Sequence, residues 1–244
     1  KPSVTGLAGG VLTLEDLDTD GAKQIVVNGP LGSGYFELDD QRQWEAFRPF
    51  RQFPNIDLRD PSVRRIDLTG DGALEIVVAE DEAFVWYKSQ GRGGFAPAER
   101  ALRGLDEERG PAIVFSEAQQ TIFLADMTGD GLTDIVRIRN GEIAYWPNHG
   151  YGRFGAKVAM AAAPRFDGPD TFDPGRIRLA DVTGTGASDL LYLGGGDVRA
   201  WLNQAGNGWS AAVQIGGFAP PAGGGEAIEV ADILGNGTPC LVWS

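Results

Sequence analysis

Residues 126–134 carry side-chain oxygens at a spacing that suits a hard cation. With Asp126 as position 1, oxygen-bearing side chains follow at positions 3, 5 and 9, on Thr128, Asp130 and Asp134. Calcium takes roughly six to eight oxygen ligands in proteins, and a tight loop with alternating carboxylates can wrap one ion. Gly131 at position 6 gives the backbone the freedom to reverse. The turn is therefore a candidate calcium loop.

The same turn recurs along the chain, beginning at Asp16, Asp67, Asp126, Asp181 and Asp232. The first three copies hold three carboxylates or an equivalent mixture, and the fourth keeps two. The fifth has Leu234, Asn236 and Cys240 at positions 3, 5 and 9, which makes a poor oxygen site. We expect structural calcium, foremost in the first three turns. The candidate ligands are Asp16, Asp18, Asp20, Asp67, Thr69, Asp71, Glu75, Asp126, Thr128, Asp130, Asp134, Asp181 and Asp189.

A second interpretation of these turns needs no metal. Asp, Asn, Thr and Gly also stabilise tight turns through local hydrogen bonds between side chain and backbone. An EF-hand is excluded, because its bidentate glutamate at position 12 is replaced by Val27, Val78 and Arg137. The turns are thus either calcium loops in β-hairpins or turns capped by their own side chains.

The spacing of the turns defines a repeating unit. Successive first aspartates lie 51, 59, 55 and 51 residues apart, within the range of propeller blades and other repeat arrays. In four copies an aromatic residue lies 28 residues after the first aspartate, and a second one lies eight residues before it. These pairs are Phe36 and Trp44, Tyr87 and Phe95, Trp146 and Phe154, and Trp201 and Trp209. The constant offsets predict a rigid supersecondary unit separated from the next by a variable loop.

Within each unit the pattern is that of short β-strands rich in β-branched and aromatic residues. In the second unit, 63–68 leads into the turn, 75–79 and 83–87 follow it, and Phe95 opens a fourth segment. The third unit repeats the pattern, with Asn140-Gly141 as a signal for a two-residue hairpin. No stretch sustains the apolar period of a helix.

Four strands per unit predict an all-β fold. We expect a β-propeller of four-stranded blades with Asp/Gly calcium-type hairpin loops, in four complete repeats plus a partial fifth. A solenoid of β-hairpins is the alternative, although its coils are usually shorter than about 50 residues. Because the fifth unit stops at Ser244, we expect residues 1–244 to form a single β-propeller domain or a fragment of a larger propeller.

The repeated aromatic residues have two possible roles. Exposed tryptophan and tyrosine side chains stack on sugars, which would indicate carbohydrate binding. Residues at identical offsets in every blade usually pack between blades instead. We therefore expect Trp146, Trp201, Phe95 and Phe154 to lie in the core.

Charge and composition exclude several classes of function. The net charge of −13 disfavours binding to nucleic acids and to anionic membranes. No apolar run approaches about 18 residues, so no membrane span is expected. A single cysteine, Cys240, and a single histidine, His149, exclude an internal disulfide and a Cys/His zinc site. His149 matches no serine or cysteine nucleophile, so we interpret it as a loop residue and expect no enzymatic activity.

The turns resemble FG-GAP/VCBS repeats, as in integrin α-chain propellers, together with Gly-Arg-Phe-Gly at 152–155 and Gly-Asn-Gly-Trp at 206–209. Longer strings resemble the propeller region of the B component of bacterial insecticidal toxin complexes (SpvB/TcdB-type). These strings are 123–142, 145–158, 176–181 and 232–243. The resemblance covers nearly the whole chain.

The resemblance to the B component implies a secreted bacterial protein without enzymatic activity. In that family the propeller region docks onto the pore-forming A component. It acts as a gate between the pore and an Rhs-repeat cocoon that encloses the toxic part of a partner subunit. We therefore expect a docking or gating module of a toxin translocation complex. The competing hypothesis is a calcium-dependent adhesion or carbohydrate-binding propeller.

Overall fold

The structure is a computed structural model that describes residues 9–29, 32–104, 106–111, 121–194, 197–216, 228–231 and 239–243. The chain divides into two compact units. The first unit comprises Lys1–Arg103 and Gly150–Gly152, and the second comprises Gly104–His149 and Arg153–Ser244. The single-domain organisation expected from the repeats stays a prediction.

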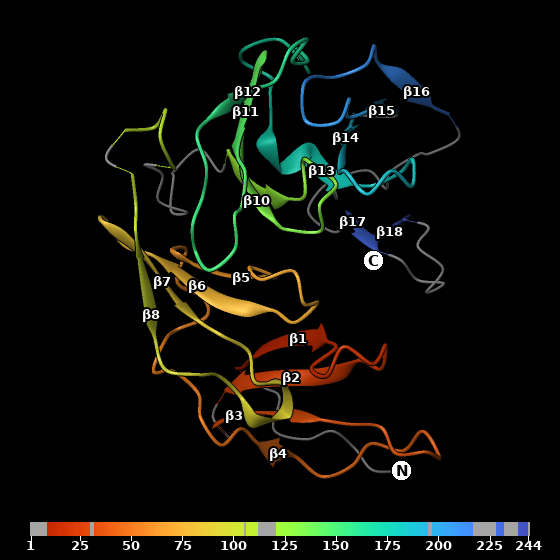
Figure 1. Cartoon of the computed structure of the whole chain (residues 1–244). Coiled ribbons are helices and arrows are strands. Elements are labelled where there is room, and N and C mark those ends of the chain that lie inside the picture. Colours follow the sequence, from red (N-terminus) through yellow and green to blue (C-terminus); the bar gives the residue numbers. More distant parts are fainter. Residues whose placement is uncertain are drawn as a thin grey trace. The chain divides into compact units, whose positions relative to one another are not determined.

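The first unit contains two four-stranded antiparallel sheets whose strands follow one another in chain order (Figure 1). One sheet holds β1 (Val11–Glu15), β2 (Gln24–Gly29), β3 (Gly32–Phe36) and β4 (Arg48–Pro49). The other holds β5 (Val63–Ile66), β6 (Glu75–Ala79), β7 (Ala83–Tyr87) and β8 (Glu99–Leu102). A 3-10 turn, η1 (Gly91–Gly93), lies between β7 and β8.

The second unit contains two further four-stranded sheets and a two-stranded one. The third sheet holds β9 (Ile122–Ala125), β10 (Asp134–Arg139), β11 (Glu142–Trp146) and β12 (Val158–Ala159). The fourth holds β13 (Ile177–Ala180), β14 (Asp189–Leu193), β15 (Val198–Trp201) and β16 (Val213–Ile215), and η2 (Pro174–Arg176) precedes it. The fifth holds β17 (Ile228–Ala231) and β18 (Cys240–Trp243).

The predicted strands of the second and third repeats are confirmed, with one difference in where the fourth strand begins. Phe95 does not open that strand; it forms an isolated antiparallel bridge with Ser89, and the strand starts at Glu99. The gap of three residues between this bridge and the fourth strand recurs in all four of the four-stranded sheets. The other repeats have the same bridge, as Leu38↔Trp44, Asn148↔Phe154 and Asn203↔Trp209.

The absence of helical periodicity agrees with the fold. Over the described ranges, the two 3-10 turns are the only helical segments. No helix in these ranges is long and apolar enough to cross a membrane.

The core lies on both faces of the central strands. All five residues of β14 are buried, as are the first five of β10, which accounts for their nearly continuous apolar sequences. Trp146 (0% exposed), Trp201 (6%) and Phe95 (1%) lie in the core as predicted, whereas Phe154 is partly exposed. The register of the repeated aromatic residues thus serves packing at these three positions.

Within each unit, neighbouring sheets are joined by an inter-sheet bridge of backbone hydrogen bonds. In the first unit Gln52 pairs with Gly94, and the Phe95 N–H donates to the Gln52 carbonyl at 2.9 Å. In the second unit Ala161 pairs with Gly208, and the Trp209 N–H donates to the Ala161 carbonyl at 3.1 Å. The bridge gives a structural reference point for comparing the two units.

Candidate metal centres in the Asp/Gly turns

Each of the four described Asp/Gly turns joins the first and second strands of its sheet and is capped by the aspartate at position 1. In all four described turns, Oδ2 of that aspartate accepts a hydrogen bond from the N–H of the glycine at position 6. The pairs are Asp16 with Gly21 (2.7 Å), Asp67 with Gly72 (2.8 Å), Asp126 with Gly131 (2.7 Å) and Asp181 with Gly186 (2.8 Å). These glycines have φ between 83° and 90°, a left-handed conformation that favours glycine.

The aspartate at position 5 caps the end of the turn. Its Oδ1 accepts the N–H of the residue two positions later, in Asp20 with Ala22 (2.8 Å), Asp71 with Ala73 (3.1 Å) and Asp130 with Leu132 (2.9 Å). The fourth turn has Thr185 there. In that turn, slight burial would raise the pKa of Asp181, but N–H groups of Gly186, Thr185 and Gly184 outweigh it and hold the pKa below its usual value.

Position 3 differs from turn to turn. Asp18 forms an ion pair with Arg92 at 2.8 Å, so its carboxylate is engaged with η1. The hydroxyl of Thr128 donates to Oδ1 of Asp126 at 3.4 Å. The buried hydroxyl oxygen of Thr69 has no hydrogen-bond partner in the described part of the protein.

The side chain at position 9 is a buried clamp. Gln24, Glu75, Asp134 and Asp189 are at most 1% exposed. A side-chain oxygen of each accepts the N–H at position 2: Leu17 (2.9 Å), Leu68 (2.8 Å), Met127 (2.9 Å) and Val182 (3.1 Å). In the third and fourth turns the other oxygen accepts the N–H of Asn148 or Asn203, each at 2.8 Å. Position 9 therefore ties the turn to the segment that follows the third strand.

These contacts support the interpretation of the turns as self-capped. The predicted ligands at positions 1, 5 and 9 accept hydrogen bonds from backbone N–H groups in their own sheet. Over the described ranges, no three acidic, histidine or cysteine side chains gather closely enough to hold a metal ion. Asp232, Leu234 and Asn236 of the fifth turn lie outside the described residues.

Among the four described turns, the second is the one with unsatisfied buried oxygens. Oε1 of Glu75, like the Thr69 hydroxyl, is buried without a well-formed hydrogen bond, and both are hard oxygen donors of the kind calcium prefers. Burial raises the pKa of Glu75 to about 7, and the charges of Asp71 and Asp67 add to the rise. The backbone amides of Leu68 and Ser89 act in the opposite direction. A cation would offset this charge and give both oxygens a partner.

The third turn shows the same electrostatic trend with its hydrogen bonds complete. Burial raises the pKa of Asp134 to about 6, although the N–H groups of Asn148 and Met127 act in the opposite direction. The charges of Asp126 and Asp130 raise it further. The carboxylate is thus held by two amides in a place that disfavours its charge.

The architecture is decided by the repeated sheet. Four antiparallel sheets of four strands in chain order, each with the same turn between its first two strands, are the blades of a propeller. The fold is a β-propeller. No family model matches the chain, and no curated protein matches its sequence significantly.

Solved structures share this fold. Part of the Photorhabdus luminescens Tc holotoxin pore matches with a TM-score of 0.76 and 24% identity, over 98% of this chain and 11% of that one. An Agrocybe aegerita lectin that recognises non-reducing terminal N-acetylglucosamine matches with a TM-score of 0.64 and 21% identity, over 96% of this chain and 60% of the lectin chain. TcdB2-TccC3 matches with a TM-score of 0.50 and 18% identity, over 98% of this chain and 14% of that one. The chain thus spans a small fraction of the toxin chains and less than two thirds of the lectin.

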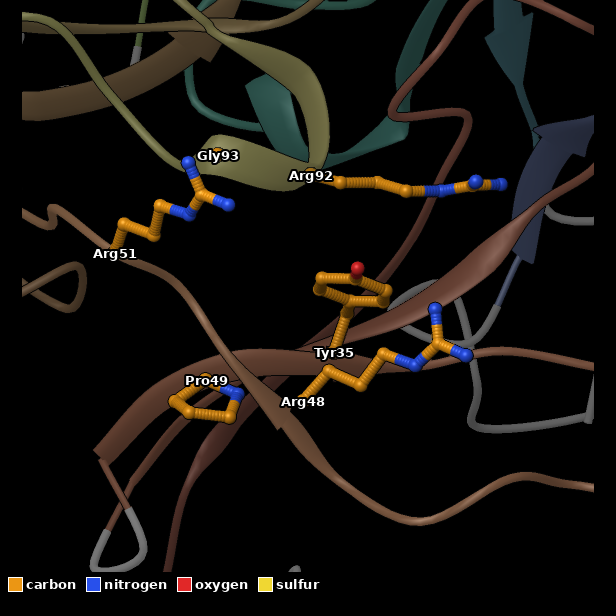
Figure 2. A pocket seen from close by; sticks show the side chains of 6 residues that line it. All are labelled: Tyr35, Arg48, Pro49, Arg51, Arg92 and Gly93. Atoms are coloured by element: carbon orange, nitrogen blue, oxygen red, sulfur yellow. The ribbon is translucent and has the colours of Figure 1, made fainter.

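One concave site was not predicted from the sequence. A pocket of about 460 Å³ in the first unit is lined by Tyr35, Arg48, Pro49, Arg51, Arg92 and Gly93 (Figure 2). Its residues come from β3, from β4 and the residue that follows Phe50, and from η1. A comparison of the repeats position by position would have singled out these arginines, since the second unit has none at the equivalent places.

Proposed function

We propose that the chain is a non-enzymatic docking module of a toxin translocation complex that binds the pore-forming A component. The observation that carries this proposal is the likeness to the Tc holotoxin pore over 98% of the chain. The sequence strings 123–142 and 145–158, which resemble the B component, also support it. They span most of β9, all of β10, parts of β11 and the start of β12 in the third blade.

The use of the carboxylates supports a role without catalysis. In the described turns they cap backbone N–H groups, accept hydrogen bonds from threonine hydroxyls or form ion pairs, all of which stabilise the turns. His149 is an exposed loop residue whose N–H donates to the Arg153 carbonyl. As part of this proposal, the protein is secreted and acts by binding a partner protein.

Structural calcium belongs to the same proposal, with the second turn as the first candidate. Asp67, Thr69, Asp71 and Glu75 would hold the ion. When bound, the ion would neutralise clustered carboxylates and stiffen the hairpin. The proposed docking role does not depend on it.

The docking role is tested by co-purification. The chain is mixed with a purified A component of an insecticidal toxin complex and passed over a size-exclusion column. Co-elution that a B component displaces would support the proposal, and separate elution at micromolar concentrations of both proteins would contradict it. Bovine serum albumin in place of the A component is the control for non-specific adsorption.

A second candidate function is carbohydrate binding. The observation in its favour is the likeness to the Agrocybe aegerita lectin over 96% of this chain. A glycan array probed with the labelled chain, in calcium and in chelator, separates the two functions. Calcium-dependent binding to a defined group of glycans, without binding to the A component, would favour the second candidate.

A further inference from the structure

The arginine-lined pocket is the strongest candidate for a second binding site, and it does not depend on the proposed docking role. Figure 2 shows the Tyr35 ring among the arginines, with Arg51 on one side and Arg48 on the other. Tyr35 is 4% exposed and its ring packs on Phe50 with 5.6 Å between ring centroids. The hydroxyl end of a fixed aromatic ring therefore forms part of a pocket otherwise lined largely by arginine side chains.

Two of the arginines are held by acidic side chains outside the pocket. Arg48 pairs with Glu37 at 3.1 Å and with Glu45, and Arg92 pairs with Asp18 at 2.8 Å and with Glu37. None of these three acids lines the pocket. The acids thus hold the guanidinium groups, while the donors that face the pocket belong to arginine and tyrosine.

Arg51 is the arginine whose charge is unengaged. Its side chain is exposed and forms no ion pair within the described part of the protein, and only its backbone N–H is used, in a 3.1 Å hydrogen bond to Gly93. A guanidinium offers five N–H donors in a planar fork that matches a carboxylate. Arg51 is therefore available to bind an anion that enters the pocket.

The second unit shows that the blade does not need these arginines. Val158 pairs with Tyr145 as Arg48 pairs with Tyr35. Gly206 lies two residues before the inter-sheet bridge, where the first unit has Arg92. A Cβ at Gly206 would lie 2.5 Å from the Tyr145 hydroxyl oxygen, so the equivalent space is closed.

Arg51 is an added residue in this comparison. Two residues separate Pro49 from Gln52 in the first unit, and one residue separates Ala159 from Ala161 in the second. The insertion places an arginine next to the inter-sheet bridge of the first unit alone. The same framework is thus built with small and apolar residues in one unit and with cations in the other.

We propose that this pocket binds the carboxylate of a small organic acid of about one sugar ring in size. Arg51 grips the carboxylate, and the Tyr35 hydroxyl and the remaining donors of Arg48 and Arg92 orient it. A volume of about 460 Å³ lies within the usual range for small-ligand pockets, of roughly 300–1,000 Å³. The positive charges of the three arginines are offset by the negative charges of Glu37, Glu45 and Asp18. Long-range attraction of an anion is therefore weak, and binding depends on direct hydrogen bonds from the pocket. We expect a modest affinity for this reason.

Isothermal titration of the full chain with D-glucuronate tests the proposal, with neutral D-glucose and inorganic sulfate as comparison ligands. We expect saturable binding of glucuronate at concentrations up to about 10 mM and none of glucose. Arg51→Gln weakens binding about ten-fold or more, because it removes a charge-assisted contact. Tyr35→Phe weakens it a few-fold. Arg42→Gln, at an exposed arginine of the same blade outside the pocket, leaves it unchanged.

A disaccharide with a terminal glucuronate identifies the source of the ligand. Tighter binding of the disaccharide assigns the pocket to a glycan end, and equal binding assigns it to a free acid. The proposal is overturned if glucuronate does not bind saturably, if sulfate binds as tightly as glucuronate, or if Arg51→Gln and Arg42→Gln have the same effect.

Discussion

Met127 and Asp134 are joined by a 2.9 Å hydrogen bond from the Met127 N–H to Oδ2 of Asp134. The other carboxylate oxygen accepts the Asn148 N–H at 2.8 Å, and the whole residue is 0% exposed. Asp134, whose spacing suggests a metal ligand, therefore also joins the turn to the segment after the third strand. The same contact to position 2 occurs in all four described turns.

The clamp predicts a large cost for Asp134→Asn. The asparagine side chain has one acceptor oxygen, and its NH2 group would face either the Met127 N–H or the Asn148 N–H. One of these buried backbone donors therefore loses its hydrogen-bond acceptor. We expect the free energy of unfolding to fall by about 2–4 kcal/mol, measured by urea denaturation. Asp130→Asn is the control, because its exposed side chain caps one N–H, and it should cost less than about 1 kcal/mol. Equal losses in the two variants would contradict a special role for position 9.

The backbone of the turn predicts a cost for Gly131→Ala. Gly131 has φ of 84°, and nothing lies within 4 Å of an added Cβ, so the cost comes from the backbone alone. We expect a loss of about 1–2 kcal/mol in the free energy of unfolding. Gly216→Ala also adds a Cβ in open space but without a positive φ, and it should stay within about 0.5 kcal/mol of the parent protein. Thermal unfolding of both variants would show whether the left-handed conformation matters.

Glu75 predicts a pH dependence that Glu75→Gln removes. Burial raises its folded-state pKa to about 7, above the unfolded value near 4.3, so the folded state holds the proton more tightly. The contribution of Glu75 to the free energy of unfolding therefore falls as pH rises from about 4.5 to about 7, by about 3–4 kcal/mol.

Gln24 performs the same clamp in the first turn with an amide oxygen, which is why glutamine should be tolerated at position 75. In chelator at pH 8, Glu75→Gln should be more stable than the parent protein, and near pH 5 the two should be similar. Urea denaturation at both pH values measures the difference. A variant that is less stable than the parent at pH 8 would show that the charge is needed.

The repeat made much of the fold predictable. The turns, the central strands and the buried Trp146 follow from offsets that recur in every unit. The function of position 9 could not be predicted, because a ligand and a clamp need the same oxygens, and only the burial of Asp134 and its amide partners separates them. Arg51 was hidden for another reason. Arg51 is a one-residue insertion in a proline-containing loop, and it is recognised only when the two units are aligned on their inter-sheet bridges.

Calcium is predicted to stabilise the protein through the second turn. At a free concentration about 100 times Kd, a single site adds about 2.7 kcal/mol to the free energy of unfolding. Asp71→Asn should remove most of this gain. Asp39→Asn should keep it, since Asp39 caps only its own turn through Gln41 and Gln43. The measurements are calorimetric titration of chelator-treated protein and its Tm in millimolar calcium. The absence of both heat and a rise in Tm would contradict calcium binding and support the self-capped turn.

A competition experiment tests the proposed docking of this propeller onto a pore-forming component. A labelled B component is bound to its immobilised A component, and the unlabelled chain is titrated in. We expect the chain to displace the labelled protein in a dose-dependent manner and a denatured sample to have no effect. Undiminished binding of the B component at a saturating concentration of the folded chain would contradict it.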